Sequence, residues 1–138
     1  MKKILVLTII ISALSIYGMS FAEKNKPYEE IGLEQLLDMR KSSNPPVVID
    51  SRGGKYFDGE MIEGAVHLSV KDTNKENLDK IIPSRNDKVV FYCSNVDCPA
   101  SGLAAYKAAY AGYKNIYKYP EGIEEWKEKG LPLSKIKL

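Results

Sequence analysis

Two kinds of hydrophobic pattern alternate along residues 31–138. Short, nearly continuous apolar runs predict buried strands at residues 47–50, 64–68, 88–93 and 115–119. Between them, apolar residues recur at helical spacing and predict helices at residues 33–41, 74–82, 100–111 and 121–129. Strands that alternate with helices favour an α/β fold, an open and mostly parallel sheet with helices on both faces. We therefore expect residues 31–138 to form one domain, which a polar leader at residues 23–30 precedes.

The first 22 residues follow a different plan. Lys2 and Lys3 precede an apolar run at residues 4–16, and Ser20 and Ala22 place small residues before a possible cleavage point. This order is typical of a secretory signal peptide. An uncleaved anchor is the alternative, but the run is shorter than the roughly 20 residues that a bilayer span needs. The sequence predicts cleavage near Ala22 and export to the periplasm or the cell exterior, with no stable membrane insertion afterwards.

The charge balance argues against one class of partner. The chain has 20 basic and 18 acidic residues, and the predicted signal holds two lysines and no acidic residue, so 18 of each remain after cleavage. A nucleic-acid-binding protein concentrates basic residues on one face. The sequence therefore predicts no nucleic-acid partner, and it indicates no oligomeric state.

Cys93 is the main candidate for chemistry. It ends the strongest predicted strand, and a loop at residues 94–99 joins it to the next predicted helix. Ligands of parallel sheets bind beyond the carboxyl ends of the strands. Amide groups in such a turn, together with the helix N-terminus, favour the thiolate form of a cysteine placed there. The alternative is that Cys93 is a small apolar residue at the end of a buried strand.

Three separated parts of the chain together resemble the rhodanese family. The first is the strand that leads into Asp50 and Arg52, and the second is the strand that ends at Cys93. The matching stretches, which span most of residues 47–132, are residues 47–52, 62–67, 89–93, 101–105, 112–116, 121–126 and 130–132. Each is weakly specific alone, whereas their order and spacing together are distinctive.

This resemblance implies a sulfurtransferase. Cys93 would attack the outer sulfur of thiosulfate, a polysulfide or a persulfide, hold it as a persulfide, and pass it to cyanide or a thiol. The resemblance implies no metal or organic cofactor, and a small sulfur compound or a protein thiol or persulfide as the partner. The backbone N–H groups of the loop would stabilise the negative charge. This loop consists of Ser94, Asn95, Val96, Asp97, Cys98 and Pro99.

The loop departs from the family pattern. In the family, four residues separate the cysteine from an arginine, which a serine follows. Aligning Ser101 with that serine places Ala100 at the arginine position and leaves six residues after Cys93. The missing arginine weakens the case for a dianionic donor such as thiosulfate. The related dual-specificity phosphatases need Cys-x5-Arg, where this chain has Pro99, so phosphate chemistry is disfavoured.

Cys98 leaves three alternatives open. It could form a disulfide with Cys93, act as a resolving thiol that discharges a Cys93 persulfide, or be a plain, partly buried thiol. Cys-x4-Cys does not match the thioredoxin-like Cys-x-x-Cys, and two thiols cannot complete a structural zinc site. A second function therefore stays open, a non-catalytic rhodanese-like module that binds a partner or senses redox state through a Cys93/Cys98 dithiol–disulfide switch.

Other polar residues have weaker claims. Asp50 and Arg52 are expected on the same rim as Cys93, where Arg52 would either supply the charge that the loop lacks or form a surface ion pair. Ser101 is a further accessory candidate, and His67 is expected to be structural or to lie on the rim. Trp126 is expected in the core. Five tyrosines are expected to pack with their hydroxyls in water: Tyr106, Tyr110, Tyr113, Tyr117 and Tyr119.

Overall fold

The main sheet of the protein is entirely parallel. The computed structural model describes residues 25–138, so the predicted signal peptide lies outside the described residues. Five strands lie in the order β1-β6-β5-β2-β4, and each neighbouring pair is parallel. Their bounds are β1 Glu29–Glu30, β2 Val47–Asp50, β4 Val66–His67, β5 Lys88–Tyr92 and β6 Asn115–Tyr119. The predicted α/β class is confirmed.

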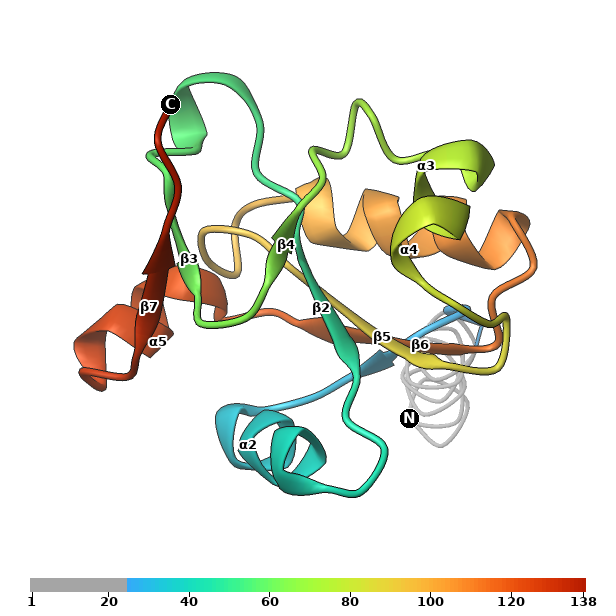
Figure 1. The fold of residues 1–138 in the computed structure, drawn as a ribbon, viewed down its shortest axis with the longest axis horizontal. Helices are drawn as coiled ribbons and strands as arrows, with labels where there is room; N and C mark the ends of the chain where they lie inside the picture. Colours follow the sequence, from blue (N-terminus) through green and yellow to red (C-terminus); the bar gives the residue numbers. More distant parts are fainter. Residues whose placement is uncertain (1–24) are drawn as a thin grey trace, which may run out of the picture.

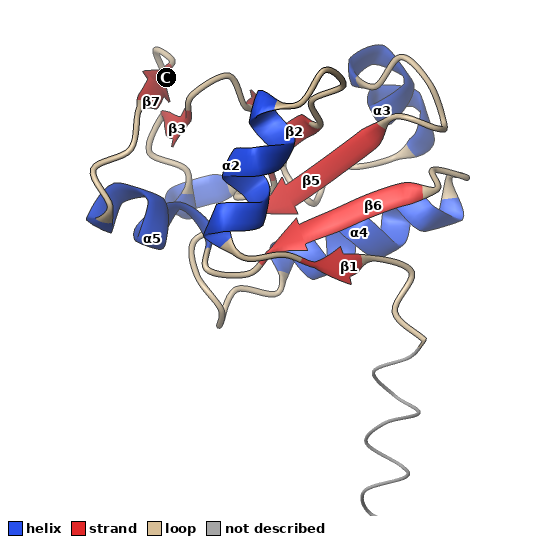
Figure 2. Cartoon of the chain, turned by 90° about the horizontal axis from the view of Figure 1, so that it is seen from below, coloured by secondary structure: helices blue, strands red, loops and turns tan. Residues whose placement is uncertain are grey.

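Helices cover both faces of this sheet (Figures 1 and 2). Their bounds are α2 Leu33–Lys41, α3 Lys75–Ile81, α4 Ala100–Tyr110 and α5 Gly122–Glu128. Apolar side chains of α2 and α5 pack on one face, and those of α3 and α4 pack on the other. Asn74 caps α3, because its side chain accepts a hydrogen bond from the N–H of Asn77 at 2.9 Å. No helix within residues 25–138 is both long and apolar enough to cross a membrane.

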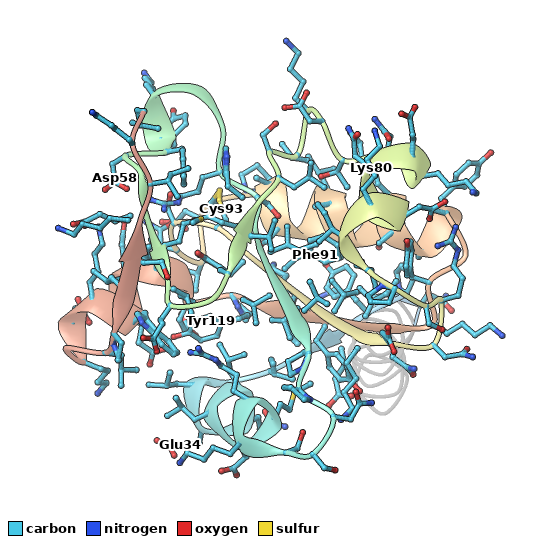
Figure 3. All side chains as sticks on the ribbon, in the orientation of Figure 1. Glu34, Asp58, Lys80, Phe91, Cys93 and Tyr119 are labelled. Carbon is cyan, nitrogen blue, oxygen red and sulfur yellow. A yellow bond between two sulfur atoms is a disulfide. The ribbon has the colours of Figure 1, made fainter. Side chains whose placement is uncertain are left out.

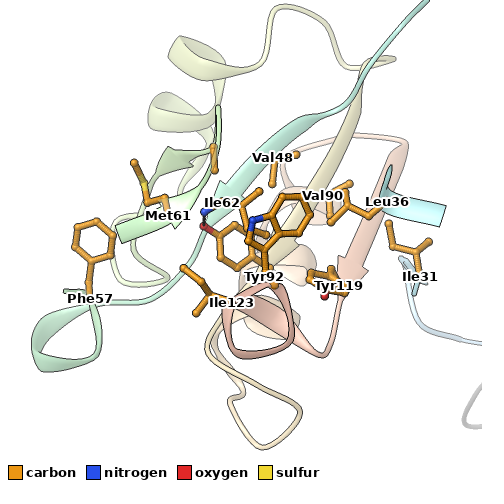
Figure 4. Close-up of a cluster of buried hydrophobic side chains, with 12 residues drawn as sticks. Ile31, Leu36, Val48, Phe57, Met61, Ile62, Val90, Tyr92, Tyr119 and Ile123 are labelled. Carbon is orange, nitrogen blue, oxygen red and sulfur yellow. Dashed lines mark hydrogen bonds between the residues drawn. The ribbon is translucent and has the colours of Figure 1, made fainter. Parts of the chain in front are cut away.

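The central strand β5 is buried on both sides. Val90 and Tyr92 point into the cluster beneath α2 and α5, whereas Val89 and Phe91 point into the cluster beneath α3 and α4. All four side chains are fully buried, which is why this strand reads as a continuous apolar run. Figure 4 shows the first cluster, with the Tyr92 ring at its centre. The second cluster includes three fully buried alanines of α4, whose small side chains let that helix lie close to the sheet.

Several short elements were not predicted. β3 (Glu60–Ile62) and β7 (Leu133–Lys135) form a separate antiparallel pair, and a single turn of 3-10 helix covers Gly54–Tyr56. β1 lies within the segment that we expected to be a leader, where it pairs with β6. The predicted helices and strands are otherwise present, and none of their ends differs from the prediction by more than two residues.

The aromatic residues follow the prediction only in part. Trp126 is a core residue, as predicted, and its indole N–H donates to the Pro132 carbonyl at 2.8 Å. Tyr113 and Tyr119 pack in the two clusters. The packing prediction was wrong for Tyr110, which is 96% exposed although its neighbours Ala108, Ala109 and Ala111 pack against the sheet, and Tyr106 is half exposed.

Replacing Tyr92 by phenylalanine is expected to lower the free energy of unfolding by about 1–3 kcal/mol, because it leaves a buried amide without a partner. The Tyr92 hydroxyl accepts the N–H of Ile62 at 3.0 Å, and both side chains are fully buried (Figure 4). Denaturant unfolding measures the change. Tyr106→Phe is the matched control at a half-exposed ring, and an equal loss in both variants would contradict the prediction.

Candidate functional site

Cys93 is held at the carboxyl end of the central strand. It follows β5 directly, and its side chain is only 1% exposed. The carbonyl oxygens of Cys93 and Ser94 accept the N–H groups of Ile123 and Glu124 at 3.0 and 3.1 Å. The first turn of α5 therefore fixes the point where the chain leaves the strand, and the position predicted for Cys93 is where the structure places it.

Cys93 forms a disulfide with Cys98 (Figure 3). The two Cα atoms are 6.2 Å apart, within the usual range for a disulfide. Of the three arrangements that the sequence left open for Cys98, the structure contains the disulfide. Residues 25–138 therefore hold no free cysteine, and the Cys93 thiolate exists only after this bond is opened.

Asn95 organises the loop between the two cysteines. Its side-chain oxygen accepts the N–H of Asp97 at 3.0 Å, and its carbonyl accepts the N–H of Cys98 at 3.1 Å. Its side-chain amide also donates to Glu124 at 2.9 Å. These bonds form a turn that carries Cys98 back toward Cys93 and ties the loop to α5.

Three backbone N–H groups of the loop are not used by its internal hydrogen bonds. The N–H groups of Asp97 and Cys98 are used by Asn95, and Pro99 has no N–H. The N–H groups of Ser94, Asn95 and Val96 donate to no described residue. None of these three residues lines the cavity in front of Cys93, so the anion-stabilising set expected over the whole loop is reduced, on the Cys93 side, to the first turn of α4, which begins at Ala100.

Arg52 and Asp50 form a buried ion pair, not the surface pair that was one of the two expectations. Asp50 is fully buried and Arg52 is 4% exposed. The guanidinium donates from Nε and Nη2 to both carboxylate oxygens of Asp50, at 2.8–3.2 Å. It also donates to the carbonyls of Tyr56 and Glu60. Burial opposes the charge, but the hydrogen bonds and charge of Asp50 outweigh it and raise the pKa of Arg52. Arg52 thus lines the same cavity as Cys93, and the carboxylate of Asp50 balances its positive charge.

A cavity of ≈ 510 Å³ opens in front of the disulfide. His67 lies on its rim, as expected; its Nε2 is 2.7 Å from the Arg52 carbonyl oxygen, and its ring stacks on Phe57. Ser101 is buried at the start of α4 and is not a lining residue. The cavity is lined by Arg52, Gly53, Gly54, Tyr56, His67, Ser69, Val70, Lys71, Asp72, Cys93, Cys98, Pro99 and Ala100.

The sequence did not single out Lys71, although it lines this cavity. Its ammonium group makes no ion pair with any described residue, in contrast to Arg52. Only the fold brings it near Cys93, because residues 69–72 follow β4 at the same edge of the sheet. Within residues 25–138, no three His, Cys, Asp or Glu side chains gather in the way that metal ligands would.

A second cavity of ≈ 500 Å³ lies on the other side of the loop. It is lined by Tyr56, Ser94, Asn95, Asp97, Cys98, Pro99 and Glu124. Tyr56, Cys98 and Pro99 line both cavities, whereas Cys93 lines only the first. The two hollows therefore meet at Cys98.

Gly122→Ala is expected to displace the Cys93 loop. Gly122 has φ +63°, which costs any L-residue about 1–2 kcal/mol. An added Cβ would also collide with the carbonyl oxygen of Cys93 and lie 2.7 Å from that of Ser94. Because both are backbone atoms, α5 or the loop has to move.

Gly130→Ala is the matched control for this prediction. Gly130 has φ +65° and nothing within 4 Å of an added Cβ, so it reports backbone strain without the collision. Denaturant unfolding and the rate of disulfide reduction are measured in both variants. Equal stability and equal reduction rates in the two would contradict the predicted role of Gly122.

Comparisons of the sequence and of the fold with known proteins point to the same family. Residues 32–129 match the rhodanese-like domain. A structure from Bacillus halodurans has a TM-score of 0.69 and 20% identity over 88% of this chain and 86% of that chain. A rhodanese from E. coli, solved with anions, has a TM-score of 0.52 and 26% identity over 66% and 99%.

The match to a third solved structure covers only a small part of that longer chain. Thiosulfate sulfurtransferase from Pseudomonas aeruginosa has a TM-score of 0.61 and 19% identity over 83% of this chain and 21% of that chain. Among curated proteins, none matches the sequence. Likeness at 19–20% identity establishes the fold, whereas the reaction has to be argued from the site.

Proposed function

Because the chain belongs to the rhodanese-like domain family, we propose that it is a sulfurtransferase whose Cys93 carries a sulfane sulfur as a persulfide. The observation that carries this proposal is the placement of Cys93. Cys93 lines a cavity of ≈ 510 Å³ at the end of the central strand, where Ala100 opens the first turn of α4. Structures described as a rhodanese and a thiosulfate sulfurtransferase share this fold, which supports the same class of reaction.

The reaction needs the reduced form of Cys93. The thiolate attacks the outer sulfur of the donor, the donor's S–S bond breaks, and its electron pair leaves on the remaining fragment. Cys93 then holds a persulfide, whose terminal negative charge the N-terminus of α4 stabilises. An acceptor thiolate or cyanide attacks the outer sulfur and takes it, and the Cys93 thiolate is regenerated.

The charges around the cavity favour some donors over others. Arg52 is neutralised by Asp50, and the carboxylate of Asp72 belongs to a residue of the lining. Lys71 is the remaining cation of the cavity lining, and it is exposed. A persulfide, whose reactive end carries one negative charge against the two of thiosulfate or inorganic polysulfide, therefore suits this site better.

Cys98 stands close enough to discharge the persulfide. In that step the Cys98 thiolate attacks Cys93 Sγ, the S–S bond of the persulfide breaks, and the outer sulfur takes a proton from solvent and leaves as hydrosulfide. This step would form the Cys93–Cys98 bond that the structure contains. Two external thiols must then reduce the Cys93–Cys98 disulfide to the dithiol, and they are themselves oxidised to one disulfide.

The same disulfide favours a second candidate function. A module that only switches between dithiol and disulfide would use the Cys93–Cys98 bond to bind a partner or sense redox state and would take up no sulfur. Either function fits the proposed site of action outside the cytoplasm, after cleavage near Ala22, because disulfides persist in oxidising compartments.

Sulfur transfer by the reduced protein tests the proposed function. The protein is reduced, freed of reductant, and supplied with thiosulfate, polysulfide or glutathione persulfide, with cyanide as the acceptor. We expect thiocyanate formation above the protein-free rate, fastest with the persulfide donor, and no activity from protein kept in the disulfide form. Reduced protein that matches the protein-free rate with every donor would leave the redox module as the function.

A further inference from the structure

The two sulfurs of the disulfide differ in access. Cys93 is 1% exposed, whereas Cys98 is partly exposed. The backbone of Cys93 is pinned between β5 and the first turn of α5, where its carbonyl accepts the N–H of Ile123 at 3.0 Å. Cys98 instead lies in the turn that Asn95 forms, with solvent-filled hollows on two sides.

The direction of attack follows from these hollows. A thiolate displaces one sulfur from another along the S–S bond, so it has to approach the attacked sulfur from the side opposite the leaving sulfur. The ≈ 510 Å³ cavity contacts both cysteines, whereas the ≈ 500 Å³ cavity contacts Cys98 without Cys93. An incoming thiol in the second cavity therefore meets Cys98, with Cys93 behind it as the leaving group.

The second cavity has acidic surroundings. Asp97 and Glu124 line it, and Glu124 also lines an adjoining hollow with Glu121, Glu125 and Glu128. No basic residue lines either hollow. A thiol with a negative charge near its sulfur is repelled there, whereas a positive charge is attracted, and added salt weakens both effects.

We propose that Cys98 is the sulfur through which an external thiol activates the protein, and that the site prefers neutral or positively charged thiols. This inference rests on the sulfurtransferase function proposed above. The external thiolate, its proton already lost to solvent, attacks Cys98 Sγ. A mixed disulfide forms on Cys98, the Cys93–Cys98 bond breaks, and its electron pair leaves on Cys93. A second thiol then attacks the mixed disulfide and frees Cys98, so two thiols become one disulfide.

The location of the first adduct tests the assignment. The oxidised wild-type protein is mixed with cysteamine, quenched in acid at early times, alkylated and cleaved before Asp97, which separates the two cysteines. We expect the cysteamine adduct on Cys98 and the alkyl group on Cys93. An adduct found mainly on Cys93, or equally on both, overturns the assignment.

The charge preference has its own readout. Cysteamine, 2-mercaptoethanol and mercaptoethanesulfonate differ in charge at similar size, and each rate is divided by the rate of the same thiol with hydroxyethyl disulfide. We expect the order cationic, neutral, anionic, with a several-fold spread that shrinks as salt is added. An anionic thiol that reacts as fast as the cationic one overturns the preference.

Failure of this inference can be told apart from failure of the proposed function. The first sulfur transfer of pre-reduced wild-type protein, measured in a single turnover, needs no opening of the disulfide, so it reports on the proposed function alone. Active reduced protein with an adduct on Cys93 would overturn only the role given to Cys98. Inactive reduced protein would overturn the sulfurtransferase, whichever sulfur accepts the thiol.

Discussion

Replacing Cys93 by serine is expected to reduce sulfur transfer to the protein-free rate, a loss on the order of 10³-fold or more if the residue is the nucleophile. A serine hydroxyl cannot hold a sulfane sulfur. The other cysteine that lines the ≈ 510 Å³ cavity is Cys98. Thiocyanate formation from polysulfide and cyanide, measured on the reduced protein, gives the change.

Cys98→Ser is the matched control for the Cys93 variant. Both substitutions remove the same disulfide, so any difference between them belongs to the role of the individual sulfur. The Cys98 variant is expected to transfer sulfur without prior reduction and to hold its persulfide longer, since no resolving thiol remains. Equal activity of the two variants would contradict the assignment of Cys93 as the sulfur carrier.

Replacing Arg52 by methionine is expected to lower the free energy of unfolding by about 3–5 kcal/mol, because it leaves a buried carboxylate without its cation. Asp50 is fully buried, and Arg52 donates three hydrogen bonds to its two oxygens. The same substitution removes the donors to the carbonyls of Tyr56 and Glu60, on the segment that forms one wall of the cavity.

The double variant Asp50→Asn/Arg52→Met separates charge from packing. With the buried negative charge removed, the double variant is expected to be more stable than Arg52→Met alone, a coupling that denaturant unfolding measures directly. If the double variant is as unstable as the single one, the lost stability comes from packing and from the two carbonyls left without donors. The unpaired Asp50 carboxylate then contributes little to it.

The main elements could be predicted because their patterns are local. The apolar run of β5 is buried on both faces by its neighbours, and the spacing of Leu33, Leu36 and Leu37 marks α2. β3 and β7 have three residues each, and their pairing joins parts of the chain about 70 residues apart. Strands this short form only when they pair with a distant part of the chain, so the local sequence pattern does not predict them.

The site was predictable in outline and not in its charges. Cys93 follows a recognisable strand, so its place at the carboxyl end of the sheet could be foreseen. Arg52 is two residues from Asp50, and only the fold shows that its guanidinium turns to that carboxylate. Lys71 lines the cavity because the chain that follows β4 passes along this edge of the sheet. The spacing of Cys93 and Cys98 was compatible with a disulfide and with two free thiols alike.

The intact mass of the reduced Cys98→Ser protein, before and after exposure to polysulfide and then to cyanide, tests the sulfur-carrier function most directly. With no second thiol to discharge it, a persulfide accumulates. The expected result is a gain of one sulfur atom, located on the peptide that contains Cys93 and removed by cyanide. A Cys93 thiol that stays open to alkylation yet takes up no sulfur from polysulfide, persulfide or thiosulfate would contradict that function.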